Sequence, residues 1–465
     1  TGKSTFLRYV CEHTKKKHVV LAPTGIAAIN AGGSTMHSFF KLPFYPLLPD
    51  DPNLSLQRGR IHEFFKYTKP HRKLLEQIEL VIIDEISMVR ADIIDAIDRI
   101  LRVYSHNLRE PFGGKQLLLV GDVFQLEPVV KNDEREILNR FYPTPYFFSA
   151  RVFGQIDLVS IELQKVYRQT DPVFVSVLDH IRTNTAGAAD LQLLNTRYGS
   201  QIEESEADMY ITLATRRDTV DSINEKKLAE LPGEPITFEG VIEGDFPESS
   251  LPTSQELVLK PGAQIIFIKN DFDRRWVNGT IGVIAGIDEE EETIYVITDD
   301  GKECDVKLES WRNIRYHYNE KTKEIEEEVL GSFTQYPIRL AWAITVHKSQ
   351  GLTFSRVVID FTGGVFAGGQ AYVALSRCTS LDGIQLKKPV NRADVFVRPE
   401  IVNFAGRFNN RQAIDKALKQ AQADVQYAAA SRAFDKGDME ECLEQFFRAI
   451  HSRYCLLYTS DAADD

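Results

Sequence analysis

The chain has 465 residues, of which 43% are hydrophobic and 26% charged, a composition typical of globular proteins. This length exceeds a single compact core and predicts about three domains. The net charge of −12 argues against a protein coated with nucleic acid, although a locally basic groove is compatible with that total. No apolar run of about 18 residues is present, so we expect no membrane span.

The cysteines indicate an intracellular protein. They form no C-x-x-C pair and no zinc set, and we expect free thiols in a reducing compartment, or simply buried small hydrophobic side chains. The five are Cys11, Cys304, Cys378, Cys442 and Cys455. No starting Met and no signal-peptide pattern precede them.

The first residues, TGKST, match the second half of a phosphate-binding loop. Such a loop needs glycine-rich backbone, a lysine for phosphates and a hydroxyl for Mg²⁺, and Lys3 and Ser4 supply the last two. The first glycine of the pattern would lie before residue 1, so we expect a chain truncated at its N-terminus that binds ATP poorly as written. Taken alone, a surface lysine beside a helix N-cap explains the motif equally well.

Residues 1–150 alternate between helical and buried-strand patterns. Three apolar runs at 18–24, 79–85 and 115–122 suit strands buried on both faces, and 89–105 has helical spacing. Together they predict a parallel sheet with helical crossovers. Four prolines after residue 40 mark a surface insertion that ends near His71.

The remaining chain predicts a second α/β domain interrupted by strands. Short β-rich runs fill 262–335 and suggest a small antiparallel barrel or sandwich, after which a buried strand and a helix resume. Residues 406–454 are helical and faintly resemble half of a tetratricopeptide hairpin. Residues 455–465 resemble a translated sequencing adapter, so we expect a non-native tail.

Two acids follow the second apolar run. Asp84 at a strand end suits a Mg²⁺ site, reached through water or Ser4, and Glu85 suits the orientation or deprotonation of an attacking water. A lone aspartate would equally suit a kinase or GTPase, whereas the paired acid favours an ATPase. A solvated strand end is the structural alternative.

Further polar residues fit the same chemistry. Gln125 follows the third apolar run and could sense a γ-phosphate, while Arg168 and Arg377 could stabilise transition-state charge or simply pair with carboxylates. A dense polar loop suggests a grip on phosphates, and it comprises Thr345, His347, Lys348, Ser349, Gln350 and Gly351.

In this order the motifs resemble those of superfamily 1 helicases, specifically the petite-integration-frequency (PIF) family and its RecD-like relatives of the 5′-to-3′ branch. The resemblance covers about residues 1–390. It rests on the segments APTGIAAINAGGSTMHSFF, VIIDEISMVRADIIDAIDRILR, LLLVGDVFQLEPV, KVYRQTD, AWAITVHKSQGLTF and YVALSRC.

The resemblance implies roles for individual residues. Gly2, Lys3, Ser4, Thr5, Asp84 and Gly351 would bind nucleotide, with Ser4 and Asp84 also holding Mg²⁺. Glu85 would activate water, Gln125 would sense the γ-phosphate, and Arg168 and Arg377 would be arginine fingers. Single-stranded DNA would contact Thr24, Thr35, His37, His347, Lys348 and Ser349.

The resemblance also implies an α/β fold with two RecA-like P-loop NTPase domains. Domain 1A would cover 1–150, with a small inserted domain 1B at about 41–73. Domain 2A would cover 151–261 and 336–405, with an SH3-like β-barrel, domain 2B, inserted at 262–335.

The implied function is an ATP- and Mg²⁺-dependent 5′-to-3′ DNA helicase that translocates on single-stranded DNA. Its expected substrates are single-strand/double-strand junctions, G-quadruplexes and R-loops, in genome maintenance, recombination, repair and telomere roles. We expect a monomer when free, without a membrane, in the cytoplasm or nucleoid of a bacterium or in a eukaryotic nucleus or mitochondrion. The alternatives are a single-strand-binding fragment inactive as a motor, a nuclease or relaxase subunit, and a P-loop kinase or GTPase.

Overall fold

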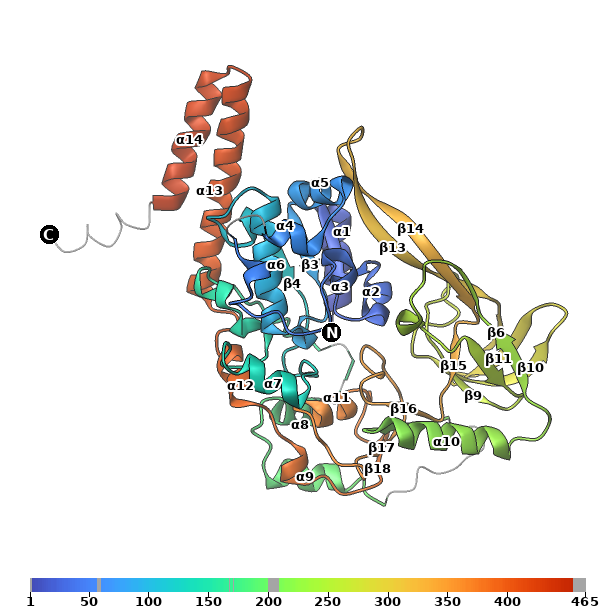
Figure 1. Cartoon of the computed structure of the whole chain (residues 1–465). Coiled ribbons are helices and arrows are strands. Elements are labelled where there is room, and N and C mark those ends of the chain that lie inside the picture. The colour runs from blue at the N-terminus through green and yellow to red at the C-terminus, as the bar shows by residue number, and fades with distance from the viewer. Residues whose placement is uncertain (1, 57–59, 167, 170, 200–208, 455–465) are drawn as a thin grey trace. The chain divides into compact units, whose positions relative to one another are not determined.

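A computed structural model describes residues 2–56, 60–166, 168–169, 171–199 and 209–454 (Figure 1). The predicted non-native tail and Cys455 lie outside these residues. The other four cysteines are free thiols, as the sequence predicted. Within the described residues, no helix is both long enough and apolar enough to cross a membrane.

The first α/β region is built on a four-stranded parallel sheet in the order β2-β1-β3-β4. The central strands β1 and β3 are buried almost throughout because helices pack around them, as their apolar sequences predict. The strands span His18–Ala22 (β1), Ser34–Thr35 (β2), Leu80–Ile83 (β3) and Gln116–Leu119 (β4). The helices are α1 (Lys3–His13), α2 (Gly25–Ala31), α3 (Met36–Phe40), α4 (Arg60–Phe65), α5 (Lys69–Gln77), α6 (Ala91–Tyr104) and α7 (Asn132–Leu138).

Helix α6 organises the loops around this sheet through buried carboxylates. The Asp92 carboxylate accepts a hydrogen bond from the Leu47 backbone N–H at 2.9 Å, and Asp95 accepts one from the Tyr142 hydroxyl at 2.9 Å. Asp98 pairs with Arg102 at 2.9 Å. These bonds offset the cost of burying charge and fix the insertion that carries Leu47.

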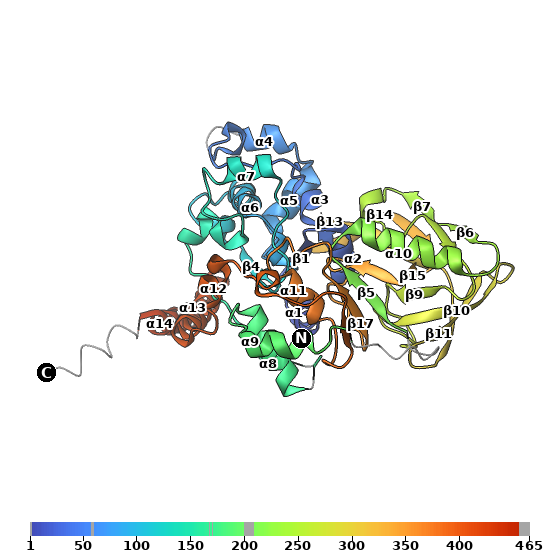
Figure 2. The same ribbon diagram turned by 90° about the horizontal axis from the view of Figure 1, so that it is seen from below.

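The second α/β region contains another parallel sheet, in the order β16-β5-β17-β18. Seen from below, α10 packs against β5 and β16 (Figure 2). The strands span Ile211–Ala214 (β5), Ala343–Thr345 (β16), Val357–Asp360 (β17) and Ile384–Leu386 (β18). The helices are α8 (Pro172–Arg182), α9 (Ala188–Asn195), α10 (Arg217–Glu230), α11 (Gln370–Leu375) and α12 (Pro399–Ala405).

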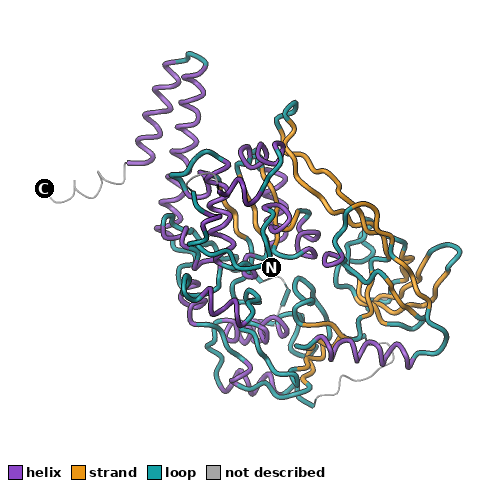
Figure 3. Tube along the Cα trace, in the orientation of Figure 1, coloured by secondary structure: helices purple, strands orange, loops and turns teal. Residues whose placement is uncertain are grey.

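Antiparallel strands form a separate core, visible as the strand-rich part of Figure 3. One sheet has the order β12-β11-β10-β9-β15, a second β13-β14-β7, and β6 pairs with β8. The strands span Ile236–Glu239 (β6), Val241–Gly244 (β7), Glu256–Leu259 (β8), Gln264–Phe267 (β9), Ile281–Asp288 (β10), Thr293–Thr298 (β11), Glu303–Val306 (β12), Glu309–Asn319 (β13), Glu324–Gln335 (β14) and Ile338–Leu340 (β15).

The strand-rich region begins earlier than the sequence predicted. Leu257 and Leu259 of β8 share a buried core with Ile265 and Phe267, and β7 extends the sheet of β14. The sequence placed residues up to 261 in the α/β domain because strands this short carry little periodicity.

A smaller compact unit comprises residues 153–164 and, within the described part of the chain, 403–454. Its helices α13 (Arg411–Asp435) and α14 (Met439–Tyr454) form an antiparallel hairpin (Figure 1). Buried alanines such as Ala423 and Ala449 allow the two helices to approach closely. The sequence assigned 153–164 to the second α/β domain, but Asp157 of this segment pairs with Lys416 at 3.0 Å.

Candidate nucleotide site and nucleic-acid interface

The start of α1 has the geometry of an anion site. Gly2 has a left-handed φ of 84°, where glycine avoids the strain of a side chain, and its carbonyl accepts the first helical bond from Phe6 N–H at 2.8 Å. Lys3, Ser4 and Thr5 form the first turn, whose backbone N–H groups lack helical partners. Such a turn favours phosphate.

Asp84 and Glu85 lie where β3 ends. The Asp84 N–H donates to Leu21 O at 2.8 Å, and the Glu85 N–H donates to Asp84 Oδ1 at 2.9 Å. Glu85 has a left-handed φ of 50°, a conformation that costs energy in a residue with a side chain. Its Oε2 is buried and has no hydrogen-bond partner among the described residues. This oxygen is therefore available to a ligand or a water.

The electrostatic surroundings bring Lys3 close to both acids. Burial raises the pKa of Asp84 and of Glu85, and the Lys3 ammonium lowers both. Asp84 and Asp122 add a further increase to the pKa of Glu85, whereas Arg377 lowers it. A desolvated carboxylate with a raised pKa is the kind of group that can accept a proton from water.

The loop after β4 brings Asp122 and Gln125 to the same edge of the sheet. Gly121 leaves no room for a side chain, because a Cβ there would lie 2.9 Å from Ile86 Cγ2. Asp122 accepts hydrogen bonds from Phe124 N–H and from Gln125 Nε2, both at 3.1 Å. The Gln125 amide is thereby held in one orientation.

Two contacts join this loop to the second α/β region. Gln350 Nε2 donates to Gln125 Oε1 at 3.4 Å. Gly369, which caps α11 at a φ of 78°, lies so close that a Cβ there would be 2.2 Å from Phe124 O. The predicted sensor residue therefore touches the helix that leads to Arg377.

Arg377 is 1% exposed and is held by backbone oxygens. It donates to Val373 O at 3.0 Å and to Ser349 O and Leu352 O at 3.3 Å. Burial and, after it, the charge of the nearby Arg168 lower its pKa to about 9.

Arg168 is placed by the same backbone segment. Its Nη1 donates to Ser376 O at 3.1 Å, and burial lowers its pKa. Among the described residues, neither Arg168 nor Arg377 forms an ion pair with a carboxylate, so the alternative of arginines paired with acids is not supported. Two desolvated guanidinium groups without a carboxylate fit a phosphate group.

These residues fit the Mg²⁺–nucleotide complex that the sequence predicts. The described residues contain no group of three or more His, Cys, Asp or Glu that could hold a metal alone. Mg²⁺ is commonly held by one or two protein oxygens together with substrate phosphates. Ser4 and Asp84 supply such oxygens beside the helix start.

The structure does not support a nucleotide contact for Gly351. This residue has a φ of 78°, and no described contact joins it to Lys3, Asp84 or Glu85. It lines a cavity of about 210 Å³ that also includes residues 277–281. Because the flanking carbonyls of Ser349 and Leu352 bind Arg377, this turn positions the arginine instead.

Two of the predicted DNA-binding residues in the first region begin helices. The Thr24 hydroxyl accepts a hydrogen bond from Ala27 N–H at 3.3 Å, and Thr35 accepts one from Ser38 N–H at 3.1 Å. His37 stacks on Phe44 with ring centroids 5.0 Å apart, and Phe44 is 83% exposed. This pair presents an aromatic face to solvent, suited to stacking on a base.

The second predicted group, at 347–349, is divided between surface and core. His347 stacks on the exposed Phe366 with centroids 6.3 Å apart, and Lys348 is exposed. Ser349 is fully buried, and its hydroxyl donates to Val346 O at 2.7 Å. The structure therefore does not support a DNA contact for Ser349, although the preceding residues His347 and Lys348 are partly exposed and exposed, respectively.

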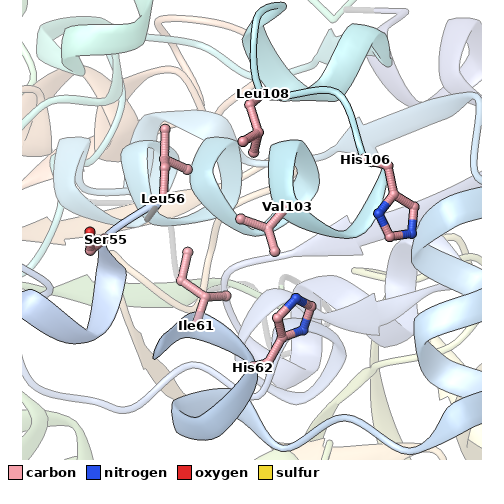
Figure 4. Close-up of a pocket in the computed structure, with 7 residues that line it drawn as sticks. All are labelled: Ser55, Leu56, Ile61, His62, Val103, His106 and Leu108. Atoms are coloured by element: carbon pink, nitrogen blue, oxygen red, sulfur yellow. The ribbon is translucent and has the colours of Figure 1, made fainter. Parts of the chain in front are cut away.

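A cavity of about 290 Å³ lies elsewhere, between α4 and α6 (Figure 4). Its lining is mainly apolar, with His62 and His106 at its border, and it contains no predicted site residue. Burial, Arg72 and His106 all lower the pKa of His62.

Comparisons with known proteins agree with this geometry. The PIF1-like helicase family model matches residues 1–184. The ATP-dependent DNA helicase Pif1 of Campylobacter jejuni is 34% identical over 386 residues, which cover 80% of this chain and 82% of that protein. The chain belongs to the PIF1-like helicase family.

Two solved PIF1-like structures extend the comparison to the fold. Bacteroides sp Pif1 in complex with ADP-AlF4 is 41% identical with a TM-score of 0.79, covering 87% of this chain and 90% of that one. Bacteroides Pif1 bound to ssDNA is 40% identical with a TM-score of 0.61, covering 89% and 92%. The predicted fold class, with RecA-like α/β regions, is confirmed.

Sequence reasoning missed three residues that organise this PIF1-like site. Asp122 orients Gln125, and Gly369, which lacks a side chain, allows the Phe124 backbone to approach closely. Tyr372 lies near Arg168 and Arg377. The sequence could have indicated Asp122 as a site residue, because it directly follows a predicted buried strand. The positions of Gly369 and Tyr372 follow from packing between regions distant in sequence, which no local motif records.

Proposed function

We propose that this protein is an ATP-dependent DNA helicase that moves 5′ to 3′ along single-stranded DNA and separates duplex ahead of it. The observation that carries the proposal is the buried Oε2 of Glu85, which has no hydrogen-bond partner among the described residues. The charge of Arg377, from the second α/β region, lowers the pKa of this carboxyl group. An acid on one side and an arginine on the other suit hydrolysis coupled to movement.

The geometry of the helix start supports the nucleotide roles. Gly2, Lys3, Ser4 and Thr5 would bind the phosphates of ATP, and Ser4 and Asp84 would hold Mg²⁺. Bound Mg²⁺ neutralises charge on the phosphates.

The chemical step falls to four further residues. Glu85 takes a proton from the attacking water, which Gln125 orients. Arg168 and Arg377 stabilise charge that develops on the transferred phosphoryl group.

The DNA roles fall on those predicted residues that are at least partly exposed. Thr24, Thr35 and Lys348 contact backbone phosphates, whereas His37 with Phe44 and His347 with Phe366 offer rings for stacking. Such contacts tolerate any base sequence, as a motor requires. We assign domain 1A to 1–150 with 1B at about 41–73, domain 2B to the strand-rich segment 236–335, and domain 2A to 165–235 and 336–402 on either side of it.

Junctions between single- and double-stranded DNA are the proposed substrates, with G-quadruplexes and R-loops as structured variants. The protein would act as a monomer when free, in a bacterial nucleoid or in a eukaryotic nucleus or mitochondrion. Roles in repair, recombination and telomere maintenance would follow from unwinding these structures.

The test uses full-length protein and two duplexes that differ only in the polarity of a single-stranded overhang. Unwinding of the 5′-overhang duplex alone, with ATP hydrolysis stimulated by single strands, is expected. Lys3→Ala should abolish hydrolysis and unwinding but leave single-strand binding within about twofold, because it removes a phosphate contact. Lys15→Ala, an exposed lysine after α1, is the matched control. A rate of ATP hydrolysis that single-stranded DNA does not change, or unwinding of the 3′-overhang duplex, would contradict the proposal.

A further inference from the structure

Arg339 lies on strand β15, outside every motif that predicted a DNA contact. Its neighbours Ile338 and Leu340 point into the antiparallel core, so the alternation of a strand directs Arg339 to the opposite face. On that face its cross-strand partner is Ile266 of β9, which belongs to the core of the second α/β region. Arg339 therefore lies at the junction of the two cores.

The guanidinium of Arg339 has no partner in the described part of the chain. It makes no hydrogen bond and no ion pair there, and burial alone lowers its pKa to about 10. The residue is nevertheless only half-buried, so solvent reaches it. Arg90 and Arg102, by contrast, have carboxylate partners: Arg90 pairs with Asp92 at 2.8 Å, and Arg102 with Asp98 at 2.9 Å.

A second unpaired cation lies close by. Burial lowers the pKa of Lys348, and the charges of Arg339 and Arg217 lower it further, while Asp221 raises it. Arg217 is already paired with Asp221 at 3.4 Å. Asp221 is thus shared with Arg217, and Arg339 and Lys348 remain as two adjacent positive charges that form no ion pair among the described residues, an arrangement that an anion would stabilise.

The backbone places this pair beside the proposed DNA path. Lys348 follows β16, where Val346 N–H donates to Ala214 O at 2.9 Å and aligns the ends of β16 and β5. The Lys348 N–H donates to Thr345 Oγ1 at 3.2 Å, which fixes the turn. His347, the adjacent residue, stacks on the exposed Phe366. A strand that stacks on these rings would carry its phosphates past Lys348.

We propose that Arg339 and Lys348 together bind one backbone phosphate of single-stranded DNA. This inference rests on the proposed function and adds a contact that no motif of the sequence contains. Arginine and lysine differ here in role, because the planar guanidinium can donate two parallel bonds while the ammonium acts as a point charge.

The experiment measures the affinity of full-length protein for a fluorescent oligo-dT strand over a series of salt concentrations, without nucleotide. Each phosphate neutralised on a single strand contributes about −0.7 to the slope of log K against log salt. Arg339→Gln should reduce the steepness of that slope by about 0.7, and Arg339→Lys should keep most of it. In the double variant Arg339→Gln/Lys348→Gln, the slope should change by scarcely more than the amount expected for one phosphate, because both residues bind the same phosphate.

The matched control is Arg312→Gln, an exposed arginine on β13 in the same strand-rich region. Its slope should equal that of the unmodified protein. If the slope for Arg312→Gln decreased as much as that for Arg339→Gln, the effect would come from net charge alone and the inference would be overturned. An unchanged slope in Arg339→Gln would also overturn it. If Arg339→Gln does not fold, the single variant Lys348→Gln tests the shared phosphate in its place, and an unchanged slope in Lys348→Gln would overturn the inference as well. Failure of the unmodified protein to bind single strands would instead contradict the proposed function.

Discussion

The loops at the ends of the two parallel sheets carry opposite charges. The first sheet ends in Asp84, Glu85 and Asp122, and burial raises the pKa of the first two. The loops associated with the second sheet carry Arg168 and Arg377, and burial lowers the pKa of both. Desolvation opposes the charged form on each side, so each set of residues is costly by itself.

The difference teaches why neither half would suffice as an ATPase. The acids can accept a proton and bind Mg²⁺ but cannot neutralise developing negative charge. The arginines can neutralise it but cannot activate water. The bond from Gln350 to Gln125 and the packing of Gly369 against Phe124 bring the two halves together. The following predictions separate the contribution of each half.

Loss of the arginine should have the largest effect. Arg377→Ala should lower kcat for ATP hydrolysis about 10³-fold while nucleotide binding changes severalfold at most, because a finger arginine acts mainly in the transition state. Arg392→Ala is the matched control, since Arg392 also binds backbone oxygens, Val395 O at 2.6 Å and Asn184 O at 3.0 Å. Steady-state phosphate release measures both, and equal losses would show a general folding effect instead.

Loss of the acid should be next in size. Glu85→Gln should lower kcat by about 10²–10³-fold with nucleotide still bound, as expected for a general base. The pKa of Glu85 is raised above its ordinary 4.5, and the active form is deprotonated. Activity of the unmodified protein should therefore fall as pH decreases through that raised pKa. Glu79→Gln, at the opposite end of β3, should preserve kcat. If the residual activity of Glu85→Gln had the same pH dependence as the unmodified protein, Glu85 would not be the general base.

The contact between the halves gives the smallest predicted effect, measured in stability. Gly369→Ala should lower the free energy of unfolding by about 2–4 kcal/mol, since its Cβ would clash with Phe124 O and its φ is left-handed. Gly364→Ala has the same backbone strain, with a φ of 80°, but open space around the Cβ. It should cost only about 1 kcal/mol. Urea unfolding compares the two, and equal costs would mean that the close approach is unimportant.

Local sequence predicted those features that depend on chemical pattern along the chain. The apolar runs became β1, β3 and β4, although β4 lies at the edge of the sheet and is only partly buried, and helical spacing at 89–105 became α6. Local sequence did not predict features that depend on contacts between residues distant along the chain. Ser349 lies in a polar motif yet is buried, because a turn after β16 directs it inward. The strands of 236–259 are recognisable only through their partners β8–β6 and β7–β14.

The carbonyl oxygens of Ser349 and Leu352 that hold Arg377 belong to the segment that presents His347 and Lys348. The two proposed ligand sites are thus joined by a single turn of main chain. Any displacement of that turn by DNA changes the placement of the guanidinium, and the reverse also holds. Thermodynamic linkage then requires that ATP change the affinity for DNA by the same factor as DNA changes the affinity for ATP. The energy of this linkage resides in peptide groups, so it would persist through most side-chain substitutions within the turn.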